Sequence, residues 1–202
     1  MKKYLLNAFF ISLIVSDPSF AGLIDVSKIV ITPSTLNTSG WLQVSEVNAI
    51  ETGTGNDLAL SSVGAVATGS SDWPSSSANF AIDSSAPSPF PQIFHSNEND
   101  GTSFLNIVLA SPSELDSITL FGRAGCCSNR DIYNIALFDS SGSLLFGAND
   151  LNATSSFHSV SIDLPNTANS VPEPAVVWLL ASGLVGLIGM KKKLPTLSGK
   201  YA

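Results

Sequence analysis

Cysteine, histidine and basic residues are scarce in this sequence. Its 202 residues include 2 Cys, 2 His and 9 Lys or Arg, and charged side chains make up 12% of the chain. No zinc-ligand cluster, nucleophile–base pair or phosphate-binding glycine loop is visible. A formal net charge of −7 argues against a surface that binds nucleic acid. The sequence therefore predicts a protein that is not an enzyme and has no nucleic-acid partner.

Most of the basic residues lie at the two ends of the chain. At the first end, Lys2 and Lys3 precede an apolar run, Tyr4–Val15, and small residues follow up to Ala21. This order is typical of a secretory signal peptide, which is predicted over residues 1–21. The run is too short to span a membrane, and the alternative interpretation is a buried first helix.

A second targeting segment is predicted over residues 168–193. The sequence Val171-Pro172-Glu173-Pro174 precedes an uncharged stretch over residues 175–190, which Lys191–Lys193 follow. At about 1.5 Å per residue this stretch forms a helix of roughly 24 Å, which crosses a bilayer core of about 30 Å only if the lysines snorkel. The arrangement resembles the PEP-CTERM sorting signal of Gram-negative bacteria that make extracellular polysaccharide. An ordinary tail anchor is the alternative, and residues 194–202 form a short tail.

The sorting-signal resemblance implies how the protein is addressed. A membrane-embedded exosortase recognises such signals, so the chain is expected to pass through the inner membrane transiently. The positive flank places the tail on the cytoplasmic side during this stage. The expected final location is the cell envelope, the cell surface or the extracellular matrix.

The middle of the chain, residues 22–167, is predicted to form one all-β domain. Short apolar runs recur between Ser-, Gly-, Asn- and Pro-rich segments, which is the pattern of a β-sandwich. Alternating apolar residues within Phe104–Leu109, Tyr133–Phe138 and His158–Leu164 place one face of each run in a core. Asp139–Gly142 separates two of the runs and predicts a hairpin turn.

The segment Arg123–Arg130 carries the strongest functional signal. It holds both cysteines, Cys126 and Cys127, in a middle region where only three basic residues face 14 acidic residues between Gly22 and Ser170. In an exported protein the adjacent thiols form a vicinal disulfide, form an intermolecular bridge or stay free. Guanidinium groups supply five hydrogen-bond donors in a rigid fork and keep their charge, which makes Arg123 and Arg130 candidate binding residues.

Together with His95 upstream, the pattern Arg123-x-Gly-Cys126-Cys127-x-x-Arg130 resembles the motif of F-type lectins. The resemblance implies a fucose-binding jelly-roll β-sandwich, similar to discoidin and galactose-binding domains, that binds an exopolysaccharide or a cell-surface glycan. It implies that Arg123 and Arg130 donate to the hydroxyls and ring oxygen of the sugar. His95 would contact the axial hydroxyl, and a disulfide between Cys126 and Cys127 would offer an apolar platform.

The same resemblance implies a structural calcium ion. Its ligands correspond to the carboxylates of Asp83 and Glu46 and to carbonyl groups near Phe80 and Ser85, all of them the hard oxygen ligands that calcium takes. The alternative is that Asp83 caps a turn and Glu46 is a solvated strand residue. The segment Trp41–Val47 resembles the family's closing strand, here placed ahead of its usual opening strand, so the sequence also predicts a circular permutation.

Four other residues bear on the function. Gly125 stands where the family has an acidic residue that orients the first arginine, and Asp131 or a neighbouring loop is the expected substitute. Trp73 either stacks on the sugar or packs under a loop, and His158 is interpreted as a core histidine. The main hypothesis is a surface-sorted lectin without catalysis, and the alternative is a structural or adhesion protein on the same sandwich that has no sugar site.

Overall fold

The computed structural model describes residues 22–165, which form an all-β, antiparallel structure. In chain order its strands are β1 (Leu23–Pro33), β2 (Gln43–Val44), β3 (Glu46–Glu51), β4 (Val66–Gly69), β5 (Phe94–His95), β6 (Leu105–Phe121), β7 (Ile132–Phe138), β8 (Leu144–Asn152) and β9 (Ser159–Asp163). Short 3₁₀ helices accompany them: η1 (Ser61–Val63), η2 (Ala78–Ile82) and η3 (Ser128–Arg130).

The two predicted targeting segments and the tail over 194–202 lie outside the described residues. Between residues 22 and 165, no helix is long and apolar enough to cross a membrane.

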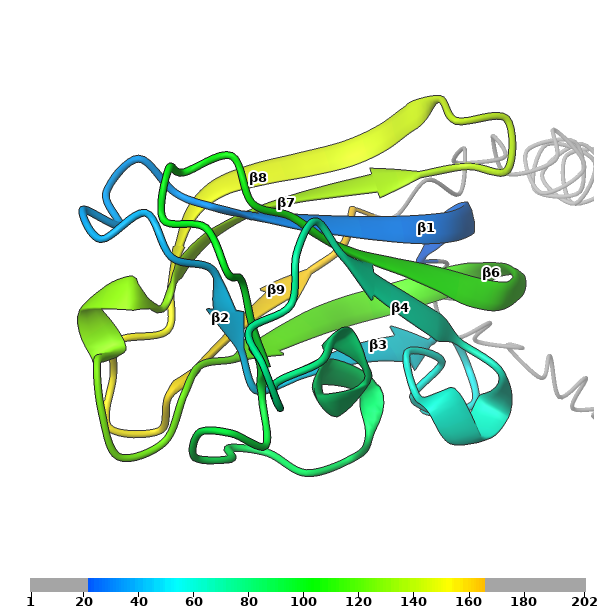
Figure 1. Ribbon diagram of the computed structural model, residues 1–202. Coiled ribbons are helices and arrows are strands. Elements are labelled where there is room, and N and C mark those ends of the chain that lie inside the picture. Colours follow the sequence, from blue (N-terminus) through cyan, green and yellow to red (C-terminus); the bar gives the residue numbers. More distant parts are fainter. Residues whose placement is uncertain (1–21, 166–202) are drawn as a thin grey trace, which may run out of the picture. The chain divides into compact units, whose positions relative to one another are not determined.

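Strand β6 connects the two groups of strands in Figure 1. Its first part, up to Val108, pairs with β4 on one side and with β1 on the other. Its last part, from Leu115 to Phe121, pairs with β3 and β9. Because β7 and β8 extend the β1 side, one 17-residue strand takes part in two layers whose apolar faces enclose the core.

The alternation predicted for three segments is confirmed. On β6, Leu105 and Ile107 are fully buried, whereas Val108 between Ile107 and Leu109 is 47% exposed. The other inward residues of these segments pack in the same core: Leu109, Tyr133, Ile135, Leu137, Val160, Ile162 and Leu164. The two-residue periodicity of the apolar side chains therefore predicted the buried faces of these strands correctly.

The predicted hairpin turn is also confirmed. It joins β7 to β8, which pair with each other in antiparallel orientation. The backbone N–H of Asp139 donates to the carbonyl of Ser143 over 3.0 Å, and that of Gly142 donates to Asp139 over 3.1 Å. Gly142 has a φ of 85°, a left-handed conformation that glycine adopts without steric cost.

Strand β1 was not predicted, although it lies between β6 and β7 in the middle of the sheet. Its Ile29 pairs with Ile107 on one side and Leu137 on the other, and all three side chains are fully buried. The alternation of β1 breaks near Val26, where the register with β6 shifts and Asp25 has a φ of 64°. The irregularity interrupts the apolar alternation that is typical of a strand, so the sequence pattern does not predict β1.

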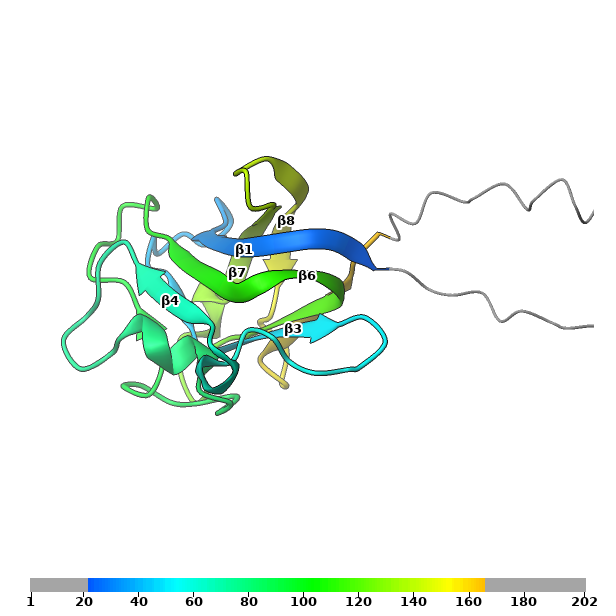
Figure 2. The same ribbon diagram turned by 90° about the vertical axis from the view of Figure 1, so that its right-hand side faces the viewer.

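The chain enters and leaves the described domain at neighbouring points. Leu23 of β1 pairs with Leu115 of β6, and Asp163 of β9 pairs with Ser117 of the same strand. Figure 2 shows the start of β1 and the end of β9 on the same side of the domain. The loop that follows Phe121, at the end of β6, therefore lies away from both chain ends.

We expect the inward and outward residues of β6 to differ in their contribution to stability. Ile107→Ala removes a fully buried side chain and should lower the free energy of unfolding by about 2 to 5 kcal/mol. The neighbouring Val108→Ala is the matched control and should cost less than about 1 kcal/mol, since Val108 is half exposed. Urea denaturation measures both values, and equal losses would contradict the assigned strand faces.

Candidate functional site

The structure brings His95, Arg123 and Arg130 together around one shallow cup. The cup has a volume of about 370 Å³, within the range of small-molecule sites. Six side chains line it: Trp41, Trp73, Phe90, His95, Arg123 and Arg130. The three polar residues singled out by the sequence pattern therefore share one site, although they are up to 35 positions apart in the chain.

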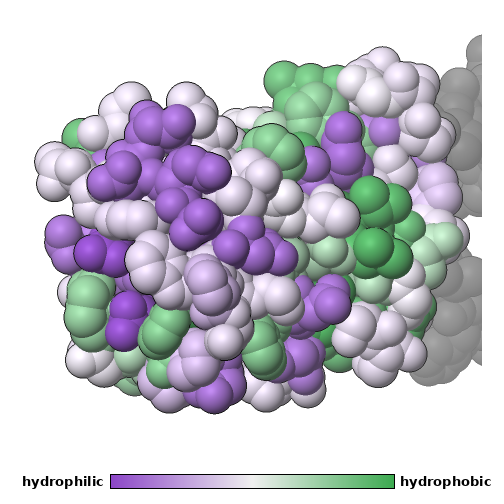
Figure 3. Space-filling view, in the orientation of Figure 1, coloured by the Kyte–Doolittle hydropathy of each residue, from purple (hydrophilic) through white to green (hydrophobic). Residues whose placement is uncertain are grey.

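Short elements and loops position these side chains. His95 ends β5 and pairs with Gln43 of β2. Arg123 follows the end of β6, and Arg130 is the last residue of η3. Trp73 is in the loop after β4, and its backbone N–H donates to the carbonyl of His95 over 2.8 Å. The site thus lies where β2, β5, the end of β6 and η3 meet, and Figure 3 shows mainly hydrophilic residues over the loops on this left-hand part of the molecule.

His95 presents a hydrogen-bond acceptor to the cup. Its Nδ1 donates to the carbonyl of Ser96 over 2.7 Å, so in the neutral ring Nε2 carries the lone pair. In the structure Nη1 of Arg130 donates a hydrogen bond to this Nε2 over 3.4 Å. Burial lowers the pKa of His95 from 6.5 and the charges of Arg130 and Arg123 lower it further, while the bond to Ser96 opposes the shift. At neutral pH the ring is therefore uncharged, and its Nε2 is an acceptor that a ligand hydroxyl can use in place of Arg130.

The two guanidinium groups remain available as donors. Neither forms an ion pair with a carboxylate of the described residues. Nε of Arg123 is buried and has no hydrogen-bond partner there. Cζ of Arg123 lies 5.2 Å from the ring centre of Phe90, and Cζ of Arg130 lies 6.0 Å from that of Trp41. Aromatic faces therefore hold both guanidinium groups, and apart from the bond from Nη1 of Arg130 to His95 their donors can turn to a ligand.

Aromatic side chains supply the apolar walls of the cup. The ring centres of Trp41 and Trp73 are 5.4 Å apart, and that of Trp73 is 5.6 Å from His95. Trp73 is 37% exposed, as is Phe90, so both present surface to a ligand. The sequence left open whether Trp73 faces the site or packs under a loop, and in the structure it lines the cup. Trp41 and Phe90 were missed, because one was assigned to a strand and the other lies in a Pro-rich loop that has no pattern.

Cys126 and Cys127 form a vicinal disulfide on the loop between the two arginines. Cys126 is exposed, and the carbonyl of Cys127 accepts a hydrogen bond from Nε2 of Gln43 over 3.0 Å. The two cysteines are not among the residues that line the cup. In the structure the apolar surface of the site comes from Trp41, Trp73 and Phe90, and the disulfide joins two consecutive residues of the loop that carries both arginines.

Asp131 does not orient the guanidinium of Arg123, contrary to expectation. Its side chain is fully buried and accepts from the backbone N–H of Arg123 and from Nε2 of Gln43, the latter over 2.9 Å. Burial raises its pKa from 3.8 to about 6, against the lowering effect of its hydrogen bonds. Nδ1 of His158 is 3.9 Å from this carboxylate, and the His158 side chain is 24% exposed. His158 is therefore a half-buried neighbour of Asp131 outside the cup.

The two carboxylates predicted to bind calcium also lie together. The backbone N–H of Ser85 donates both to Oε2 of Glu46 and to Oδ1 of Asp83, each over 3.0 Å. Glu46 is 1% exposed, and its Oε1 has no partner among the described residues, so it is not a solvated strand residue. Burial, and then the nearby charge of Asp83, raise the pKa of Glu46 to about 7, although the Ser85 bond lowers it.

This arrangement fits a calcium ion in its chemistry, because a buried, unsatisfied carboxylate oxygen is what a cation would neutralise. Phe80 lies on η2, and Ser85 lies three residues after the end of that helix. The Ser85 carbonyl accepts a hydrogen bond from the Ser88 hydroxyl over 2.8 Å. Among residues 22–165 there is no group of three or more His, Cys, Asp or Glu side chains that could hold a metal. A calcium ion here would depend on two carboxylates and on backbone carbonyls.

No protein-family model, curated protein or solved structure matches this chain. The resemblances to F-type lectins and to PEP-CTERM signals therefore stay predictions. The geometry of the cup is the observation on which a functional conclusion can rest.

We expect Asp131 to make stability fall as the pH rises from about 4 to 6. The folded state holds this proton more tightly than the unfolded state, so ionisation favours unfolding, by up to about 3 kcal/mol for a shift of this size. Asp131→Asn stays neutral and should lose this part of the pH dependence, whereas the exposed Asp163→Asn should keep it. Urea unfolding at several pH values measures the slope, and identical slopes in wild type and Asp131→Asn would contradict the assignment.

Proposed function

We propose that this protein is an exported, non-catalytic carbohydrate-binding protein that binds fucose or a similar neutral sugar in the cup. The observation that carries the proposal is the convergence of Arg123, Arg130 and His95 in one site of monosaccharide size, with both guanidinium groups free of ion pairs. The partner would be an exopolysaccharide or a glycan of the cell surface.

The donors and the acceptor of the cup match a sugar hydroxyl. A hydroxyl donates one hydrogen bond and accepts others, so it can replace the 3.4 Å bond between Arg130 and His95, donating to Nε2 of His95 and accepting from Arg130. Arg123 also lines the cup and forms no ion pair, so its guanidinium offers donors for a second sugar oxygen. The indole rings of Trp41 and Trp73 and the ring of Phe90 then face the carbon-bound hydrogens of the sugar.

The resemblance to F-type lectins supports the same function and a jelly-roll topology of the galactose-binding type. The all-β, two-layered arrangement agrees with that topology in outline. The proposed circular permutation is physically reasonable because β1 begins and β9 ends beside the same part of β6. Gly125 stands where the family has an acidic residue. No atom lies within 4 Å of the position that its Cβ would take, and its φ of 81° is a left-handed backbone conformation that favours glycine.

The proposal includes the route to the cell surface. The predicted signal peptide leads the chain out of the cytoplasm, and the predicted PEP-CTERM segment directs it to an exosortase and then to the surface or matrix. A glycan-binding domain delivered to a polysaccharide matrix would hold the protein there. A structural calcium ion between Glu46 and Asp83, with carbonyls near Phe80 and Ser85, would brace the segment that precedes the cup.

Removing a polar side chain of the cup should weaken sugar binding and leave the fold intact. Charge-assisted hydrogen bonds contribute about 1.5 to 3 kcal/mol each, so Arg123→Ala, Arg130→Ala or His95→Ala should weaken binding by roughly tenfold to a hundredfold. Lys28→Ala is the matched control, because Lys28 packs over Phe138 on the sheet and not in the cup.

A glycan array followed by calorimetry with L-fucose measures these effects, and thermal unfolding confirms that each variant is folded. Binding that is unchanged in all three cup variants would contradict the proposal. An absence of sugar binding in the wild type would favour the alternative, a structural or adhesion protein without a sugar site.

Calcium should stabilise the wild type, and Glu46 should be required for the effect. At a calcium concentration about 100 times the Kd, binding adds about 2.7 kcal/mol to the free energy of unfolding. Glu46→Gln removes a ligand charge and should lose most of this gain, whereas Glu51→Gln on the same strand should keep it. Thermal unfolding in calcium and in chelator makes the comparison, and an equal response of all three proteins would contradict the site.

A further inference from the structure

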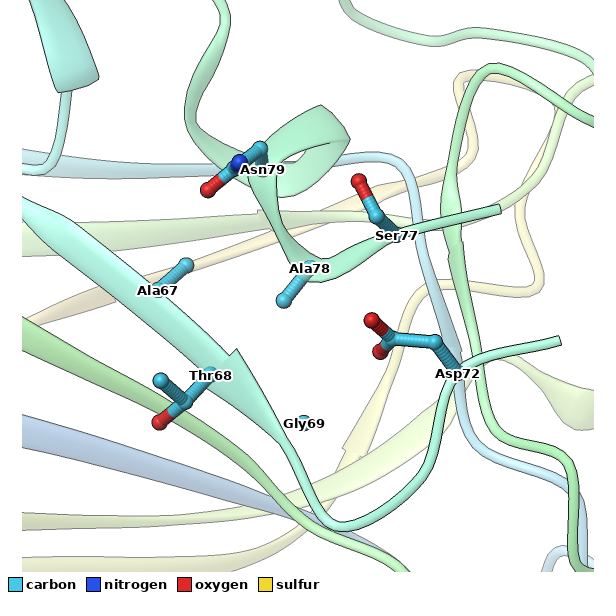
Figure 4. Close-up of a pocket in the computed structure, with 7 residues that line it drawn as sticks. All are labelled: Ala67, Thr68, Gly69, Asp72, Ser77, Ala78 and Asn79. Atoms are coloured by element: carbon cyan, nitrogen blue, oxygen red, sulfur yellow. The ribbon is translucent and has the colours of Figure 1, made fainter. Parts of the chain in front are cut away.

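A second cavity lies beside the cup and is formed by different residues. Its volume is about 220 Å³, and it lies between the end of β4 and the start of η2. Its lining consists of Ala67, Thr68, Gly69, Asp72, Ser77, Ala78 and Asn79. Figure 4 shows the Asp72 carboxylate pointing from its loop into the space between Gly69 and Ala78.

One loop separates this cavity from the cup. Asp72 lines the second cavity, and the next residue, Trp73, lines the cup. Consecutive Cα atoms are about 3.8 Å apart, so the two sites are neighbours across a single peptide unit. The Trp73 N–H donates to the carbonyl of His95 over 2.8 Å, and the Ser76 N–H donates to the carbonyl of Trp73 over 2.9 Å. These bonds fix the shared wall to β5.

The wall of the cavity at residue 69 has no room for a side chain. A Cβ at Gly69 would come within 2.4 Å of the Phe94 ring and 2.8 Å of Oδ1 of Asp72. Phe94 is fully buried and precedes His95 of the cup on β5, so the same strand supports both sites. The floor between them is therefore packed and cannot move without disturbing the core.

The lining carries hydrogen-bonding groups that the protein itself leaves unused. The side chains of Thr68, Ser77 and Asn79 make no hydrogen bond to another described residue. The Asp72 carboxylate accepts one bond, from the backbone N–H of Ala78, and keeps further acceptor capacity. Two hydroxyls, an amide and a carboxylate suit a ligand rich in hydroxyl groups. The single ionisable group in the lining is acidic, which disfavours an anionic ligand such as a uronic acid.

We propose that this cavity is a subsite for the second, neutral sugar residue of a glycan whose terminal residue occupies the cup. This inference rests on the proposed function, because it requires a sugar in the cup. A glycan that crosses the wall at Asp72 and Trp73 places its first ring against the aromatic side chains and its second ring against Asp72 and Asn79. The protein then selects neutral oligosaccharides over single sugars and over acidic chains.

The test compares L-fucose with a neutral fucosylated trisaccharide, fucosyllactose, by calorimetry. The wild type should bind the trisaccharide about tenfold more tightly, which two additional neutral hydrogen bonds can supply. Asp72→Asn and Asn79→Ala should each reduce this ratio of Kd values towards one. Asp163→Asn is the matched control, since Asp163 is an exposed carboxylate at the end of β9, and it should keep the wild-type ratio.

The outcomes distinguish the subsite from the cup. If the wild type binds both sugars equally, or if Asp72→Asn and Asn79→Ala keep the wild-type ratio, the subsite is refuted while the cup remains. If the wild type binds neither sugar, the proposed function fails and the subsite fails with it. A trisaccharide with a uronic acid in the second position should bind no better than fucose, and tighter binding of that sugar would also overturn the subsite.

Discussion

The buried carboxyl group of Asp131 holds the candidate binding loop to the β-structure. It accepts from Nε2 of Gln43 over 2.9 Å and from the backbone N–H of Arg123, and the Tyr133 hydroxyl lies 3.3 Å from it. Nε2 of Gln43 also donates to the carbonyl of Cys127 over 3.0 Å, and the Tyr133 hydroxyl donates to the backbone carbonyl of Gln43 over 2.8 Å. Because a buried polar group is costly unless it is hydrogen-bonded, this network fixes β2, β7 and the loop relative to one another.

The chemistry of the cup favours a neutral ligand over an anion. Two guanidinium groups alone would suit a phosphate or a carboxylate, but an ionised carboxylate has no O–H to donate to the Nε2 acceptor of His95. The domain also places three basic residues against 14 acidic residues, and this field repels anions at long range. A hydroxyl donates to His95 and accepts from Arg130, while aromatic walls contact the carbon skeleton. A sugar meets all of these conditions.

The sequence was informative wherever a local pattern expressed the structure. Alternation identified the buried faces of β6, β7 and β9, and the motif around Arg123 and Arg130 identified the polar half of the cup together with His95. Strand β1 was missed because its alternation breaks at a bulge, and the predicted strand over Trp41–Val47 is divided between β2 and β3, which belong to different sheets. The prediction of the aromatic half of the cup was incomplete for a related reason. Trp41 and Phe90 reach the site on segments that have no repeating sequence pattern. Contacts between distant loops depend on tertiary packing, which no local pattern encodes.

The central claim is that Arg123, Arg130, His95 and the two indole rings form one sugar site. An NMR titration of the domain with L-fucose tests it most directly by following the indole N–H signals of Trp41 and Trp73 and the Nε–H signals of Arg123 and Arg130. We predict that these signals shift together along one saturable curve, while the backbone N–H signals of residues outside the cup, such as Val108 on β6, stay in place. Signals that do not move at saturating sugar, or shifts confined to another face of the domain, would contradict the account.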